Sequence, residues 1–104
     1  MEAAEVYQIV EREILGDWSS SNAHGVDLKR CLINPPERRV YQESGTQQEM
    51  HLWLVLEEMP DDHTGYSIAF DDAASMFGLA TRGWHGEEIF LGYYGTFLET
   101  LEAM

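Results

Sequence analysis

The stretch His51-Leu52-Trp53-Leu54-Val55-Leu56-Glu57-Glu58 decides the fold class of this chain of 104 residues. Its run of Leu, Trp and Val is apolar on both faces of an extended backbone, which is typical of a strand in the middle of a sheet. The run is far shorter than the roughly 20 apolar residues that span a bilayer. We therefore predict a buried central strand over residues 51–58.

Weaker strand signals lie on both sides of this segment. Residues 66–71 alternate large apolar with small or polar side chains, the two-residue period of a half-buried strand. Further strands are predicted over residues 26–33, 38–42, 76–81 and 88–91. Asn34-Pro35-Pro36 should end the first of these, because proline cannot donate to a ladder. Gly92-Tyr93-Tyr94-Gly95 is interpreted as a tight turn whose tyrosines pack on the core.

Helices are predicted near the two ends of the chain. Residues 3–14 repeat apolar side chains at spacings of three and four, and Gly16 follows as an expected left-handed C-cap. Thr96-Phe97-Leu98-Glu99 has the form of a capping box. Residues 17–25 read as a polar loop, which we expect Trp18 to anchor against the core. Short connections favour an α+β fold: one domain, 1–104, with an antiparallel meander of about five strands and both helices on one face.

The sequence contains no constellation that predicts catalysis, a metal or a cofactor. Cys31 lies in an apolar stretch, where cysteine is usually inert, and the four histidines lack the spacing of a helical zinc motif. Acidic doublets on a strand point to opposite faces, so a doublet does not form an acid–base pair by itself. We expect a protein that is not an enzyme and uses no cofactor. The single cysteine and the absence of an apolar leader favour the cytoplasm.

Charge is the more informative feature. The net charge is −13, which argues against binding to duplex nucleic acid or to an anionic membrane. Residues 57–104 hold ten acidic residues and one basic residue, Arg82, a balance of −9. Because consecutive strand ends lie at opposite edges of a meander, we expect two separate acidic rims.

The acidic doublets of this half and the aromatic residues near them are the candidate partner-binding residues. They are Glu57, Glu58, Asp61, Asp62, Asp71, Asp72, Trp84, Glu87, Glu88, Tyr93 and Tyr94. Acidic surfaces steer basic partners, and Trp and Tyr dominate binding hot spots. Burial in the core is the competing interpretation of the three aromatic residues, and we expect it for two of them. Solubility alone explains the acids equally well, so both interpretations stay open.

Four segments resemble small bacterial proteins of uncharacterised function. They are residues 53–58, 65–71, 77–80 and 92–101, which together cover the C-terminal half. In size and character the chain is similar to immunity proteins of polymorphic and contact-dependent toxin systems. This resemblance implies a cytoplasmic protein that binds and blocks a basic toxin without a cofactor. It carries no functional residue over to this chain.

Two other functions remain open. One is a small-ligand-binding domain or enzyme with a pocket between sheet and helices, and with Asp71 and His85 at its rim. The other is a homo-oligomeric structural protein that pairs an exposed apolar patch across a two-fold axis.

Overall fold

The computed structural model describes residues 1–19 and 22–104. Ser20 and Ser21, in the predicted polar loop, lie outside the described residues. In chain order the elements are α1 (Ala3–Ile14), α2 (Leu28–Cys31), β1 (Leu32–Glu43), β2 (Glu49–Met59), β3 (Thr64–Asp71), β4 (Met76–Arg82), β5 (Glu88–Gly95) and α3 (Phe97–Ala103).

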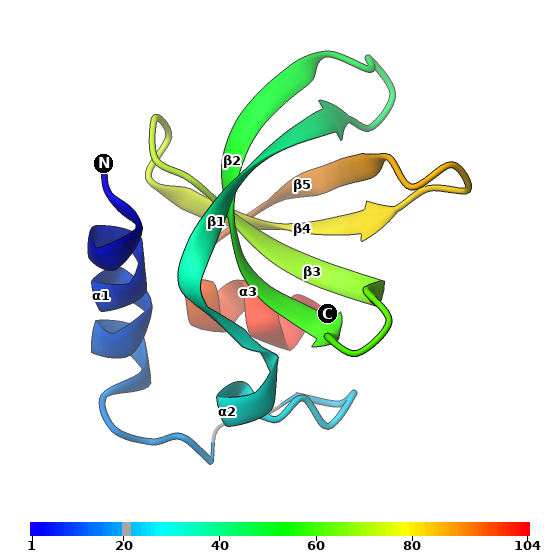
Figure 1. Cartoon of the computed structure of the whole chain (residues 1–104). Coiled ribbons are helices and arrows are strands. Elements are labelled where there is room, and N and C mark those ends of the chain that lie inside the picture. The colour runs from blue at the N-terminus through cyan, green and yellow to red at the C-terminus, as the bar shows by residue number, and fades with distance from the viewer. Residues whose placement is uncertain (20–21) are drawn as a thin grey trace.

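The five strands form an antiparallel meander in which β2 pairs with both β1 and β3, as its apolar sequence predicts (Figure 1). The sheet then curls until its two outer strands meet. There β1 and β5 pair in parallel through Gln42 with Ile89 and through Glu43 with Phe90, which closes the sheet into a barrel. The fold is therefore α+β, and barrel closure is the feature that the sequence did not predict.

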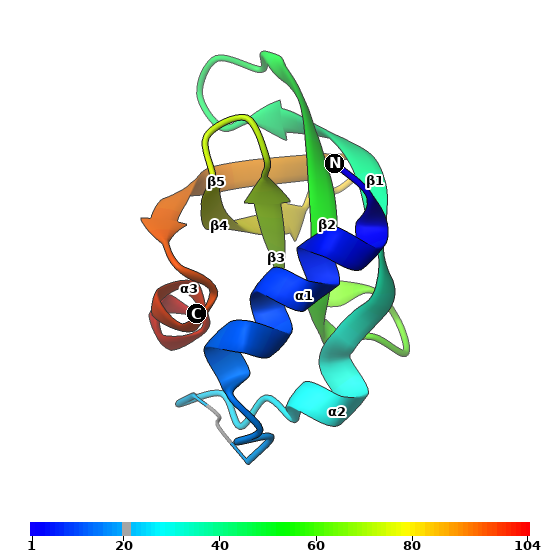
Figure 2. The ribbon, with the colours of Figure 1, turned by 90° about the vertical axis from the view of Figure 1, so that its left-hand side faces the viewer.

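The two terminal helices pack together against the outer face of the barrel (Figure 2). The core between helices and sheet contains side chains from both helices and from β2, β3 and β4. It includes Val6, Val10, Ile14, Val55, Leu56, Ile68, Phe70, Phe77, Leu79, Phe97 and Leu101. A second, smaller core fills the barrel itself and consists of Tyr41, Leu52, Ala69, Ala80 and Phe90.

Because both faces of β3 are covered, our prediction of a half-buried strand is wrong for its second half. Ile68 and Phe70 pack under the helices, while Ala69 points into the barrel and is equally inaccessible. Small residues face inward at this position: Ala69 pairs with Gly78, and a β-carbon on Gly78 would lie 2.3 Å from the carbonyl oxygen of Gly92. The narrow barrel interior depends on these small residues.

The segment predicted as a strand over residues 26–33 is partly helical. Asp27 accepts a hydrogen bond from the Lys29 amide and so begins the single turn α2. The prolines at 35 and 36 do not end β1 because the pairing of β1 with β2 is irregular between Leu32 and Glu37, where no ladder amide is required. One long strand replaces the two short ones that we expected.

The predicted helices are confirmed. Helix α1 ends at Ile14, and the left-handed conformation falls on both Leu15 and Gly16. The capping box of Thr96 and Glu99 is present at the start of α3. Helix α1 supplies a further cap to α3, since the Glu13 carboxylate accepts the amides of Phe97 at 3.0 Å and Leu98 at 3.1 Å. Trp18 packs against the core, as expected.

Candidate functional site

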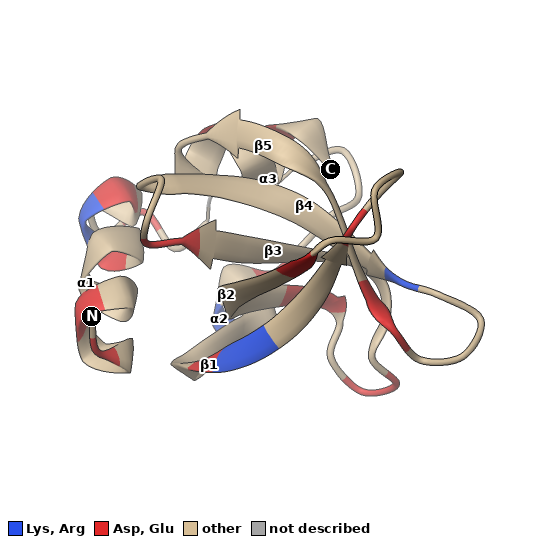
Figure 3. Cartoon of the chain, turned by 90° about the horizontal axis from the view of Figure 1, so that it is seen from above, with Lys and Arg blue, Asp and Glu red and all other residues tan. Residues whose placement is uncertain are grey.

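Two turns, residues 60–63 and 83–87, lie at the same end of the barrel (Figure 1). We call these two turns, together with the strand ends that they join, the turn end. The β3–β4 turn, residues 72–75, lies at the opposite end. Acidic residues mark both ends, in the arrangement that the meander predicts (Figure 3). The turn end holds Glu57, Glu58, Asp61, Asp62, Glu87 and Glu88, and the opposite end holds Asp71 and Asp72.

At the turn end the barrel interior changes from apolar to polar. Strand register places one polar side chain from each strand on the inward face there, because these residues alternate with the outward-facing ones. We call this set the polar layer: Arg39 of β1, Glu57 of β2, Ser67 of β3, Arg82 of β4 and Glu88 of β5. It separates the apolar interior from solvent.

Ion pairs hold the polar layer together. The Oε1 atom of Glu88 accepts hydrogen bonds from Arg82 at 3.1 Å and from Arg39 at 3.4 Å. The Arg39 guanidinium also bonds to Glu37 at 2.6 Å, and chiefly this bond raises the pKa of Arg39. Two of the six basic residues of the chain are thus paired with carboxylates at the rim of the barrel, where each side chain stays about one-third exposed.

Glu57 and Glu58 have different roles because adjacent strand residues face opposite ways. Glu57 points inward, is 6% exposed, and bonds to His63 at 2.8 Å. Glu58 points outward, where its carboxylate bonds to His24 at 2.9 Å and accepts the Tyr66 amide at 3.0 Å. Both carboxylates tie loops to the end of β2, and Glu57 is too buried to contact a partner protein.

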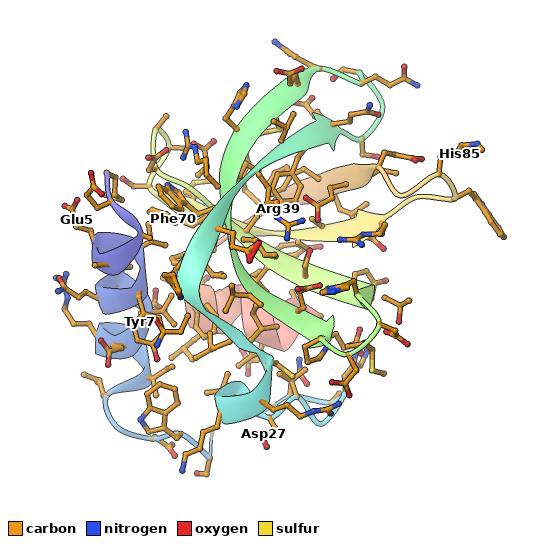
Figure 4. All side chains as sticks on the ribbon, viewed as in Figure 1. Glu5, Tyr7, Asp27, Arg39, Phe70 and His85 are labelled. Carbon is orange, nitrogen blue, oxygen red and sulfur yellow. The ribbon has the colours of Figure 1, made fainter. Side chains whose placement is uncertain are left out.

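The β4–β5 turn presents the most exposed large hydrophobic side chain of the described residues, Trp84, which is 100% exposed. The Glu87 carbonyl accepts the Gly83 amide at 2.8 Å, and the Gly83 carbonyl accepts the Gly86 amide at 3.1 Å. The Glu87 carboxylate folds back to accept the His85 amide at 3.1 Å. His85 projects from the tip of this turn, away from the barrel, whereas Arg39 lies against the barrel (Figure 4). A braced turn therefore holds Trp84 out in solvent.

The tyrosines are arranged differently from our expectation. Residues 92–95 continue β5 as a strand, and Tyr93 and Tyr94 are 40% and 46% exposed, so the prediction that two of the three candidate aromatic residues are buried is wrong. The Tyr93 hydroxyl donates to Asp71 at the opposite end of the barrel. Burial and this hydrogen bond raise the pKa of Tyr93 to about 12.

The candidate residues thus fall into three groups. Trp84 lies with the acids of the turn end, Tyr93 lies with Asp71 at the other end, and Tyr94 lines a hollow with Glu99 and Glu102 on α3. Asp72 also lies away from the turn end, bonded to Arg38 at 3.2 Å and to the Trp53 indole at 3.3 Å. Only the first group forms a surface with both an exposed tryptophan and a concentration of acids.

The structure does not bring together the residues that we considered for a ligand or enzyme pocket. Asp71 and His85, proposed for a pocket rim, lie at opposite ends of the barrel. Burial raises the pKa of the Cys31 thiol, whose Sγ contacts the Glu58 carbonyl. Within residues 1–19 and 22–104, no three His, Cys, Asp or Glu side chains come together as a metal site.

Sequence reasoning missed the polar layer. Its signal is present in the alternation of β3 and β4, where Ser67 shares a face with Ala69 and Arg82 shares a face with Ala80. On one face of a strand, a small residue followed two positions away by a polar residue indicates a narrow interior whose end is in contact with water. Without barrel closure we had no reason to regard that face as an interior.

No protein-family model, curated protein or solved structure matches this chain. In the described part of the chain, no helix combines the length and the apolar character needed to cross a membrane.

Proposed function

We propose that this chain is a non-enzymatic protein-binding domain, and that its turn end binds a basic protein. The exposure of Trp84 supports this proposal most strongly. A side chain of this size loses a large favourable transfer free energy when it stands in water, and its burial in a partner recovers that energy. Tryptophan is also among the residues most enriched at the centres of binding interfaces.

The bracing of the turn makes Trp84 suitable for binding. Its backbone is fixed by the Gly83–Glu87 and Gly86–Gly83 hydrogen bonds and by the Glu87 carboxylate. A pre-organised turn loses less conformational entropy on association than a flexible loop does. The indole would therefore enter a partner with little ordering cost.

Charge supports a basic partner. Asp61 and Asp62 are exposed on the neighbouring β2–β3 turn, and Glu87 lies beside Trp84. Asp61 pairs with Arg30, an exposed ion pair of small energetic value that a partner can replace. Together with the net charge of −13, these acids would accelerate encounter with a basic surface. An immunity-type inhibitor that blocks a basic toxin is the specific form of this function that we propose.

Co-purification from the source cells tests the proposal. We expect immobilised wild-type protein to retain a basic protein at low salt and to release it at high salt, since salt screens exposed charges. The W84A variant should lose this protein, and Y94A, which removes an exposed aromatic residue elsewhere, should keep it. Failure of the wild-type protein to retain any basic protein at low salt would contradict the proposal.

A further inference from the structure

A mainly apolar groove lies between the two terminal helices and the β3–β4 hairpin, away from the turn end (Figure 2). Helix α1 contributes Ile9 and Glu13 to its lining, the hairpin contributes Phe70 and Phe77, and α3 contributes Glu99. We call it the helix groove. Its volume is about 360 Å³, and sites for small organic ligands are concave, mainly apolar and at least about 300 Å³ in volume. The helix groove therefore has the size and the character of such a site.

Contacts between the walls hold the helix groove in shape. The Glu13 carboxylate joins α1 to α3 by accepting the amides of Phe97 at 3.0 Å and Leu98 at 3.1 Å. On the hairpin, the rings of Phe70 and Phe77 pack with their centroids 4.6 Å apart. A ligand would enter a site that is already formed, so binding would cost little conformational entropy.

The charge of the helix groove is negative. Two of its described lining residues, Glu13 and Glu99, carry carboxylates, and the α-amino group of Met1 is the one cationic group among them. The chain as a whole carries a net charge of −13. Beside an apolar surface, which screens charges less than water does, two carboxylates attract a cation and repel an anion.

Glu99 has an oxygen available to bind a ligand. Its carboxylate lies over Gly95, which also lines the helix groove: a β-carbon on Gly95 would be 2.9 Å from Oε1 and 3.7 Å from Oε2. The Oε1 atom accepts the Thr96 amide at 3.2 Å. The Oε2 atom makes no hydrogen bond to the described residues, so it can accept one from a ligand.

We propose that the helix groove binds a small organic ammonium ion that carries an aryl or alkyl group. The apolar group contacts Ile9 and the edges of the Phe70 and Phe77 rings, and the ammonium donates a hydrogen bond to Glu99. Charge-assisted hydrogen bonds are stronger than neutral ones, so the ammonium favours this ligand over a neutral compound of the same shape. An anionic compound is excluded by the two carboxylates.

A titration with two probes of the same shape tests this inference. Phenethylammonium and 2-phenylethanol differ in the cationic group alone, and amide chemical shifts of the full chain report where each one binds. We would work in about 0.15 M salt, which screens unspecific attraction to exposed acids. Phenethylammonium should give saturable shift changes at Ile9, Met76 and Thr96. The alcohol should bind roughly three- to tenfold more weakly, since it lacks the ion pair with Glu99.

A matched pair of variants tests the role of Glu99. E99Q removes the charge but keeps the capping box, because glutamine also serves at this position. It should bind phenethylammonium roughly three- to tenfold more weakly and bind 2-phenylethanol as wild type does. E102Q removes an exposed carboxylate from the same helix but outside the helix groove, and it should leave both affinities unchanged.

Three results would overturn the inference. One is the absence of saturable shift changes at the helix groove, including the case in which phenethylammonium shifts only the amides of the turn end. Another is equal binding of the two probes by wild type, which needs no variant to interpret. The third is an equal effect of E99Q and E102Q. None of these results bears on partner binding by Trp84, which lies at the other end of the barrel and is tested separately by the salt-dependent co-purification.

Discussion

The Oε1 atom of Glu87 lies 2.0 Å from the position that a β-carbon on Gly83 would occupy. Gly83 thus makes room for the carboxylate that braces the β4–β5 turn, and the carboxylate in turn accepts the His85 amide. This relationship connects a single glycine to the way in which Trp84 is displayed. A substitution at Gly83 should therefore disturb this turn alone, whereas a substitution at a glycine inside the barrel should lower the stability of the whole fold.

We predict that G83A loosens the turn without unfolding the protein. The added methyl group meets the end of a flexible side chain, which can swing away and release the His85 amide. Amide hydrogen exchange should become faster at residues 83–87 alone, and the free energy of unfolding should change by less than about 1 kcal/mol. Unchanged exchange in this turn would show that Glu87 does not brace it.

The matched substitution G78A should be far more harmful. Its β-carbon would lie 2.3 Å from the Gly92 carbonyl oxygen and 2.4 Å from the Phe90 ring, inside the narrow barrel. Backbone and a packed ring cannot move aside as Glu87 can, so we expect a loss of about 2–4 kcal/mol. Urea denaturation of the two variants measures the difference. Equal stability of G78A and G83A would mean that the barrel interior is looser than we describe.

Helix α3 should depend on a carboxylate that is distant in sequence. Glu13 accepts the first two amides of α3, those of Phe97 and Leu98, and so acts as a cap supplied by α1. We predict that E13A lowers the free energy of unfolding by about 1 kcal/mol, within the range of other lost helix caps. Glu11 is an exposed residue of the same helix, and the control variant E11A should have nearly the same free energy of unfolding as wild type. Thermal or urea unfolding measures the stability of both variants. Equal losses of stability in E13A and E11A would contradict the role of Glu13 as a cap of α3.

Asp72 should contribute a pH-dependent part of the stability. Burial tends to raise the pKa of this carboxyl, but hydrogen bonds from the Trp53 indole and from Arg38 outweigh burial and lower it. A lowered folded-state pKa means that the stabilisation is full above the unfolded-state pKa of about 3.9 and is lost as the pH falls through the folded-state value. D72N should therefore be less stable than wild type at pH 6.5, and the gap should narrow at pH 2.5. A gap that is constant with pH would contradict this assignment.

Local signals predicted most of the elements. The apolar run at 52–56 predicted a central strand, the spacing in residues 3–14 predicted α1, and the capping box of Thr96 and Glu99 predicted the start of α3. In each case the signal lies within a few residues of the element that it specifies. The α2 turn was missed because its four residues are too few to show a period.

Barrel closure could not be predicted in the same way. It depends on two residue pairs between β1 and β5, which are separated by most of the sheet. No local pattern in Gln42 or Ile89 reports that contact, because it follows from the accumulated twist and curl of the whole sheet. The burial of Ala69 inside the barrel follows from the same closure.

The candidate surface was predicted in part. The acids of the turn end and Trp84 were identified from composition and spacing, but Glu57 is a buried member of the polar layer. A sequence shows that a carboxylate ends a strand, whereas only the register shows whether it faces solvent or the barrel. Glu57 and Glu58 are neighbours with opposite orientations for that reason.

The binding affinity of W84A tests the central claim most directly. We would measure it by titration calorimetry with the basic protein that the wild type retains, beside wild type and Y94A. The account predicts that W84A keeps its stability, since the indole is fully exposed, and loses about 2 kcal/mol of binding free energy, a weakening of roughly thirtyfold. Y94A should bind as wild type does. Equal affinity of W84A and wild type would contradict the claim that the turn end is the binding surface.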